Sequence, residues 1–349
     1  MSVYIITFLF AVIFSYFADK IKKKNLKQSN IILGIALLPM AVVSAIRHNV
    51  GIDYDIIYVR LWNSVINGMK FNKEASIGIE ILMKISALFT DNYVIFFVVT
   101  TLIIFILLFK VLKDNSNNYF LSVIIFFVGC YFFESMNLVR QYITMFIFLY
   151  AFKYIVEKKF KEYFISIMIA TSIHTIAIIY LPMYFICKLK KVKIQYIAIV
   201  ISVLLYNIIT AIIFKVISYT EFSWYFNSRY DLKSISVIPL LTNSFIWLLA
   251  ISLYKEEKCD EKYLAMLWIQ FMAIFVTIFS KFIPQCDRIT IMFSVIQIIF
   301  IPDILSRFKY NSTRYTLTIG IVLLYAVIVL YYNVIIKGGY GVLPYQTIF

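Results

Sequence analysis

Apolar side chains recur along this chain in eleven long runs separated by short polar stretches. Most runs approach the roughly 20 residues that an α-helix needs to cross the hydrocarbon core of a bilayer. They cover residues 3–18, 31–46, 94–112, 119–133, 138–155, 163–187, 194–218, 237–254, 261–281, 288–305 and 314–336. A weaker run, 76–90, contains Glu80 and Lys84 and is either a short span or an amphipathic helix at the surface. The pattern predicts an all-α, polytopic integral membrane protein with about 10–12 transmembrane helices.

Composition supports this fold class and excludes others. Apolar residues make up 62% of the 349 residues and charged residues only 15%, against about 25% charged in soluble domains. We therefore expect a single polytopic membrane domain over 1–349, with outer loops at about 47–75 and 219–236. The net charge of +15 is spread between the apolar runs, which argues against nucleic acid as a partner. The four cysteines have no CxxC spacing, so we expect no metal and no cofactor.

The basic residues predict the topology, because Lys and Arg favour cytoplasmic loops. Basic clusters lie at 20–27, 110–113, 153–161, 188–193, 255–262 and 307–314. All six lie inside only if 76–90 does not make a full crossing and 163–187 forms a hairpin with a turn near Ser172–Thr175. A single crossing by 163–187 is the alternative, and it would invert the downstream loops. In the hairpin topology both the amino terminus and the carboxy-terminal tail lie outside.

Five of the seven arginines do not follow this rule. They fall at the predicted outer face, at Arg47, Arg60, Arg140, Arg229 and Arg288. The planar guanidinium grips phosphate oxygens in pairs, so arginines at an outer face indicate an anionic ligand such as a phosphorylated lipid. The alternative is that they bind lipid headgroups or pair with Asp53, Asp55, Glu134, Asp231 and Asp287.

Two sequence segments carry most of the candidate chemistry. Asn137, Arg140 and Gln141 are spaced i, i+3 and i+4, which predicts one shared helix face at the start of a span. A helix start favours an anion through its free N–H groups and dipole.

The second segment follows the second apolar run. Arg47 is succeeded by Gly51, which permits a tight turn, and by Asp53, Tyr54 and Asp55. A carboxylate here is a candidate general base for a sugar hydroxyl. A structural ion pair with Arg47 is the alternative.

Two further polar features fall inside or between apolar runs. His174 is a polar residue in an apolar stretch, which makes it a functional candidate. It is a candidate base, a candidate acid or a hydrogen-bond donor to a phosphate, and a histidine that only packs between helices is the alternative. The outer loop 219–236 contributes Trp224, Arg229 and Tyr230, whose rings suit either a sugar or the interfacial aromatic belt.

These segments, in this order, resemble the EpsG family within the Wzy-like polysaccharide polymerases. The residues that carry the resemblance are Arg47 with Val50-Gly51-Ile52-Asp53-Tyr54 and Tyr58, Asn137-Leu138-Val139-Arg140-Gln141, Ala170 to His174 with Leu181-Pro182, Arg288, and Leu343-Pro344-Tyr345. Ile52 departs from the family pattern, which more often has Thr there.

The resemblance implies a multi-pass enzyme of the bacterial cytoplasmic membrane with a helical fold similar to the GT-C glycosyltransferases. Such enzymes join oligosaccharide repeat units carried on undecaprenyl pyrophosphate, at the outer face, for a capsule, an exopolysaccharide or O-antigen. The implied partners are this lipid-linked oligosaccharide, membrane lipid and a chain-length regulator protein. The activity would be metal-independent, because arginines can neutralise the departing pyrophosphate.

The resemblance also implies roles for individual residues. Arg140 and Arg288 would bind the donor pyrophosphate, with Arg47 and Arg229 assisting. His174 or Asp53 would deprotonate or orient the acceptor hydroxyl. The remaining expected substrate contacts are Tyr54, Asn137, Gln141 and Tyr230.

Three other activities fit the sequence pattern. An O-antigen ligase would share the donor chemistry and pass the glycan to lipid A. A lipid-linked oligosaccharide flippase would need cations along a cavity that opens to both faces. A membrane acyltransferase would need its histidine near a cytoplasmic acyl donor.

Overall fold

The computed structural model describes all residues except 69–75, 220–222, 224–225, 227–234 and 256–259. Within those described parts every named element is a helix, which confirms the all-α fold class. The only β-pairing recorded there is an isolated antiparallel bridge between Arg47 and Thr347. The chain divides into two compact units, residues 1–181 with 301–349 and residues 182–300. That they form one membrane domain stays a prediction.

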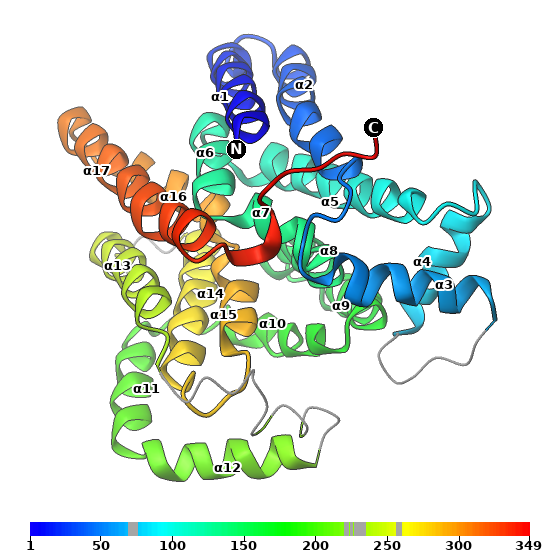
Figure 1. The fold of residues 1–349 in the computed structure, drawn as a ribbon. Coiled ribbons are helices and arrows are strands. Elements are labelled where there is room, and N and C mark those ends of the chain that lie inside the picture. Colours follow the sequence, from blue (N-terminus) through cyan, green and yellow to red (C-terminus); the bar gives the residue numbers. More distant parts are fainter. Residues whose placement is uncertain (69–75, 220–222, 224–225, 227–234, 256–259) are drawn as a thin grey trace. The chain divides into compact units, whose positions relative to one another are not determined.

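The first unit contains most of the helices drawn in blue, cyan, green and red in Figure 1. They are α1 (Ser2–Lys22), α2 (Leu26–Ala45), η1 (Tyr54–Val59), α3 (Arg60–Ile66), α4 (Ile77–Ala87), α5 (Val94–Asn115), α6 (Tyr119–Val128), α7 (Tyr131–Asn137), α8 (Val139–Val156), α9 (Phe160–Ile173), η2 (Thr175–Tyr180), α17 (Asn311–Leu324), η5 (Tyr325–Ile336) and η6 (Gly339–Gly341). The boundary with the second unit falls inside α16 (Gln297–Ser306).

The second unit is built around a buried polar cluster. Its helices are α10 (Met183–Ile186), α11 (Lys193–Leu204), α12 (Tyr206–Ser218), α13 (Val237–Leu253), α14 (Glu261–Ile278) and α15 (Cys286–Ser294). The Asn243 side-chain oxygen accepts hydrogen bonds from the Gln270 amide at 3.0 Å and from the Gln297 amide and Ser294 hydroxyl, both at 2.9 Å. Polar side chains that bond one another in this way hold apolar helices together.

Five helices in the described parts are long and apolar enough to span a bilayer: α1, α2, α5, α14 and the continuous stretch Asn311–Ile336. The number rises to eight if three bent pairs, α6 with α7, α11 with α12 and α15 with α16, each count as one span. The structure is thus polytopic, as predicted. Including the two shorter apolar helices, Thr175–Ile186 and Val237–Leu253, brings the number to ten, the lower end of the predicted range.

One end of the first unit, the lysine end, carries basic residues. The Asp19 carboxylate accepts from the backbone N–H groups of Tyr119 and Phe120 at 2.9 and 2.7 Å, in the first turn of α6. The Lys22 ammonium donates to the Ser116 carbonyl at 2.8 Å. The connections α1–α2 and α5–α6 therefore lie together, as the clustering of lysines in these loops requires.

At the opposite end of the same unit, the start of α1 meets the carboxy-terminal tail. This end is called the arginine end below, because Arg47 pairs with the tail there. The Tyr4 hydroxyl donates to the Val342 carbonyl at 3.0 Å, and the Tyr345 hydroxyl donates to the Val43 carbonyl at 2.9 Å. The start of the chain and the tail thus share one face, as the predicted topology requires.

The weak apolar run forms α4, whose 11 residues rise only about 16 Å. That is about half the thickness of the hydrocarbon core. Glu80 and Lys84 form an ion pair of 2.5 Å, with the lysine side chain largely exposed. The segment is therefore too short for a straight crossing, in agreement with the predicted topology.

The apolar segment after α8 turns back on itself. α9 ends at Ile173, and His174 adopts an extended conformation. The chain then runs back alongside α9 as η2. The evidence is a hydrogen bond of 2.5 Å from the Tyr163 hydroxyl, near the start of α9, to the Tyr180 carbonyl at the end of η2. The Tyr180 ring also stacks on Phe148 of α8, with centroids 3.8 Å apart. The predicted hairpin, with its turn near Ser172–Thr175, is confirmed as far as residue 180.

We expect Tyr163→Phe to weaken this hairpin without disrupting the fold. The substitution keeps the buried ring and removes the hydrogen bond from the Tyr163 hydroxyl to the Tyr180 carbonyl. The free energy of unfolding should therefore fall by about 1 kcal/mol or somewhat more. Thermal unfolding in detergent measures this, with exposed Tyr315→Phe as the matched control. Equal melting temperatures for Tyr163→Phe and wild type would contradict the prediction.

Candidate functional site

Two segments far apart in sequence pair at the arginine end: the Arg47 loop, residues 46–59, and the carboxy-terminal tail, residues 339–349. Four backbone hydrogen bonds join them: His48 N–H to Gln346 O at 3.0 Å, Ile348 N–H to Ile46 O at 3.1 Å, Gly51 N–H to Gly341 O at 2.9 Å and Ile52 N–H to Tyr340 O at 3.2 Å. In Figure 1 the red tail runs beside the blue loop that follows α2. The tail therefore holds the Arg47 loop in place.

Gly51 lets the Arg47 loop approach the end of α7. Its φ of +107° favours glycine. A Cβ at this position would lie 2.9 Å from the Met136 carbonyl oxygen and 3.3 Å from the Asn137 Cα. Directly after this contact, the Asp53 N–H donates to the Asn137 side-chain oxygen at 2.9 Å. Two of the predicted motifs thus meet in space.

Gly51→Ala is expected to destabilise the protein by about 1–3 kcal/mol, because a backbone carbonyl cannot move aside cheaply. Gly68→Ala is the matched control, since Gly68 has a φ of +64° with open space around the missing Cβ. Thermal unfolding in detergent compares the two variants. If they lose the same stability, backbone conformation alone accounts for the effect and the close approach to α7 does not matter.

Arg140 lies at the second position of α8, half-buried. Its backbone N–H donates to the Tyr58 hydroxyl at 3.3 Å, and its side chain also interacts with Tyr58. Burial raises the pKa of Tyr58, which the Arg140 charge opposes and the Asp53 charge increases. Tyr58 therefore lies within the electrostatic reach of both candidate residues. The cluster of Asp53, Tyr58, Asn137 and Arg140 is called the Arg140 cluster below.

One detail of the predicted geometry was wrong. Asn137 does not share a helix with Arg140 and Gln141, because α7 ends at Asn137 and α8 begins at Val139. Leu138 between them has a ψ of +51°, which breaks the helix. Asn137 contributes to the cluster through its bond to Asp53 instead. Gln141 is 3% exposed, so its side chain lies inside the bundle.

Arg47 is buried, with 1% of its surface exposed. Its guanidinium donates to the Ser44 carbonyl and lies over the Phe97 ring, 4.7 Å from the centroid. Its Nε has no hydrogen-bond partner in the described structure. No carboxylate there lies within ion-pair distance, so the ion pair with Asp53 or Asp55 considered above is wrong.

Tyrosines rather than carboxylates are the ionisable groups that influence this cation. Tyr4, Tyr54, Tyr58 and Tyr345 all lie within its electrostatic reach, and burial lowers the pKa of Arg47 to about 10. The group therefore stays charged at neutral pH. Tyr54 is itself engaged in structure, since its ring stacks on Phe97 at 4.2 Å and its hydroxyl donates to the Arg47 carbonyl at 3.3 Å.

His174 reaches the same end of the first unit by another route. α8 and α9 form a hairpin closed by residues 157–159, and α9 is four residues shorter than α8, 14 against 18. At 1.5 Å per residue, the end of α9 lies roughly 6 Å along the axis from the start of α8. His174, half-buried directly after α9, therefore lies near the level of Arg140. Its turn packs closely on α4, where Gly78 contacts the Ser172 backbone.

Two further predicted site residues, Arg229 and Tyr230, fall outside the described residues. Arg288 lies in the first turn of α15 in the second unit, as expected for a residue at a helix start. Among the described residues no group of three His, Cys, Asp or Glu side chains could hold a metal.

Sequence reasoning overlooked the roles of several aromatic residues. Tyr58 belongs to the quoted motif but was not assigned a role, and Phe97 and Tyr4 carried no signal beyond their hydrophobicity. The signal that could have found Tyr58 is its spacing from Tyr54, one helical turn away.

Fold and site together define the class: a multi-pass, all-helical membrane protein that gathers arginine, carboxylate, tyrosine and histidine side chains at one end of a helical unit. The family model for EpsG matches residues 30–347. The chain belongs to the EpsG family, a family of Wzy-like polysaccharide polymerases that are glycosyltransferase-like. Neither a curated protein nor a solved structure matches it.

Proposed function

We propose that this protein polymerises undecaprenyl-pyrophosphate-linked oligosaccharide repeat units at the outer face of the bacterial cytoplasmic membrane. The product would be a capsule, an exopolysaccharide or O-antigen. The observation that supports this most is the Arg140 cluster, in which an arginine at a helix start bonds a tyrosine hydroxyl that also lies within electrostatic reach of the Asp53 carboxylate. The family match spans every segment of this cluster.

In the proposed reaction, the anomeric carbon of the growing chain loses its bond to undecaprenyl pyrophosphate. A hydroxyl oxygen of the next lipid-linked unit forms the new glycosidic bond to that carbon, and its proton passes to a base. The departing pyrophosphate gains negative charge, which Arg140 and the positive end of α8 would stabilise. Asp53 or His174 would accept the proton.

The other arginines take supporting roles in this proposal. Arg288 would contact the donor pyrophosphate, with Arg229 assisting. Arg47 is too buried to touch a ligand as the structure stands. It would act on the ligand electrostatically from a distance, because the interaction between two charges is stronger in a medium of low dielectric constant. With arginines neutralising the leaving group, we propose that the reaction needs no metal.

The test uses the purified full-length protein in vesicles supplied with lipid-linked repeat units. We expect a ladder of polymers that differ by one repeat unit. Transfer of glycan only when lipid A is added would identify a ligase instead. Movement of the lipid-linked unit between leaflets without any polymer would identify a flippase. Either outcome would overturn the proposal.

A further inference from the structure

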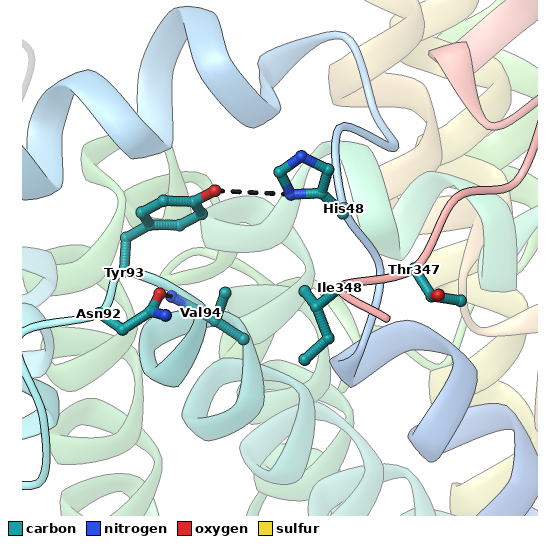
Figure 2. Close-up of a pocket in the computed structure, with 6 residues that line it drawn as sticks. All are labelled: His48, Asn92, Tyr93, Val94, Thr347 and Ile348. Carbon is teal, nitrogen blue, oxygen red and sulfur yellow. Dashed lines mark hydrogen bonds between the residues drawn. The ribbon is translucent and has the colours of Figure 1, made fainter.

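A small pocket opens beside the Arg47 loop, on residues that the proposed mechanism does not use. It has a volume of about 230 Å³ and is lined by His48, Asn92, Tyr93, Val94, Thr347 and Ile348. The lining comes from three segments of the first unit: the Arg47 loop, the residues at the start of α5, and the carboxy-terminal tail. Figure 2 shows the Tyr93 hydroxyl pointing towards the His48 ring, 3.5 Å from its Nδ1.

The chemistry of this pocket differs from that of the Arg140 cluster. None of its six lining residues carries a permanent charge. Arg47, although adjacent in sequence to His48, is buried against Phe97 and does not line it. A pyrophosphate therefore has no counter-charge here. Apolar side chains and a tyrosine ring combined with a few hydrogen-bonding groups suit a neutral, hydroxyl-bearing ligand.

One ring nitrogen of His48 is available to form a hydrogen bond with a ligand. Its Nδ1 faces Tyr93, and its Nε2 has no partner in the described residues. The ring is half-buried and edge-on to Tyr54, with centroids 6.0 Å apart, so its orientation is constrained. Whichever tautomer Tyr93 selects, Nε2 can either donate to or accept from a hydroxyl. A sugar hydroxyl can play both parts.

The size of the pocket limits what it can hold. Pockets for drug-sized ligands are about 300–1,000 Å³, so this smaller one suits a single sugar ring rather than a whole oligosaccharide. A ring bound here would be one residue of a longer chain whose other residues extend into solvent.

A series of packed aromatic rings connects the pocket to the Arg140 cluster. The two are linked through packed rings: Tyr93 lies 6.2 Å from Tyr54, Tyr54 stacks on Phe97 at 4.2 Å, and Phe97 lies 6.1 Å from Tyr58. Tyr58 in turn bonds Arg140. The neutral pocket and the cationic Arg140 cluster thus lie at the same end of the unit, with these packed aromatic rings between them.

From this arrangement we propose that the pocket is a carbohydrate subsite that holds one sugar ring of the repeat unit, with His48 bonding a ring hydroxyl. The inference rests on the proposed function for the identity of the glycan. It adds a site for a neutral sugar, distinct from the residues assigned to the pyrophosphate. His48 and Tyr93 are then binding residues, and the tail is part of the site through Thr347.

The test measures binding separately from catalysis. The probe is the phosphate-free oligosaccharide released by mild acid from the cell's own lipid-linked repeat units. Saturation-transfer NMR with the full-length protein in detergent should show transfer concentrated on one sugar of this probe. His48→Ala should raise its Kd by about tenfold or more, because a site built to bond a hydroxyl discriminates strongly. Tyr93→Phe should have a smaller effect, and exposed Asn63→Ala on α3 should have none.

The outcomes separate the two proposals. Saturation transfer that His48→Ala abolishes supports the subsite even if wild-type protein makes no polymer, a result that would sink only the proposed function. Polymer synthesis by wild type, with probe binding unaffected by His48→Ala in a folded protein, would overturn the subsite alone. If an added polyprenol abolishes saturation transfer to the probe, the pocket binds lipid. That result would also overturn the proposed carbohydrate subsite.

Discussion

Replacing Arg140 with alanine is expected to lower the rate of polymer synthesis by about 10²–10³-fold, the usual effect of removing a group that stabilises developing negative charge. The residue lies at the start of α8, where its charge and the helix dipole favour the same anion. Arg140→Lys should recover only part of the rate, since an ammonium cannot grip two phosphate oxygens in one plane. Initial rates with purified lipid-linked repeat units provide the measurement.

Arg60→Ala is the matched control for this substitution. Arg60 lies at the start of α3 and is exposed to solvent, so its replacement likewise removes one positive charge from a helix start. We expect its rate to equal that of wild type. Equal losses from Arg60→Ala and Arg140→Ala would indicate a general effect of surface charge. A normal rate for Arg140→Ala, at normal protein levels, would contradict the assignment of the donor site.

Hydropathy predicted where helices lie better than where they bend. The run 119–133 reads as one span, yet α6 and α7 meet at 54° around Gly129 and Cys130. Cys130 has a φ of +64°, a conformation that no sequence pattern requires of a cysteine. Such bends depend on the packing of neighbouring helices, which apolar runs do not record.

The candidate site was predicted in pieces. The two motifs that contain Asp53 and Asn137 are 84 residues apart, and only the fold reveals that they share a hydrogen bond. Gly51 carried a usable signal, since a glycine before a polar turn indicates close approach or positive φ. The burial of Arg47 carried none, because it depends on Phe97 and on a tail some 300 residues away.

That burial leads to the second prediction: Arg47→Met should keep the protein folded, with an unchanged or higher melting temperature, and should reduce polymer synthesis by about tenfold to a hundredfold. A buried charge without a carboxylate partner costs stability. Methionine has a similar length and can pack against Phe97 without that cost. A position that sacrifices stability for charge is expected at a functional site. Thermal unfolding and polymerisation rates, measured on the same preparation, separate the two effects.

Arg47→Lys distinguishes charge from shape at this position. It keeps the cation but loses the planar group that lies over Phe97 and reaches Ser44. If charge alone supports the reaction, Arg47→Lys should retain most of the rate that Arg47→Met loses. If instead Arg47→Met and Arg47→Lys both unfold at lower temperature, the guanidinium has a structural role and links Ser44 at the end of α2 to the Phe97 ring of α5. The positive charge of Arg47 would then play no direct part in the reaction, and the residue would be needed for its hydrogen-bond donors.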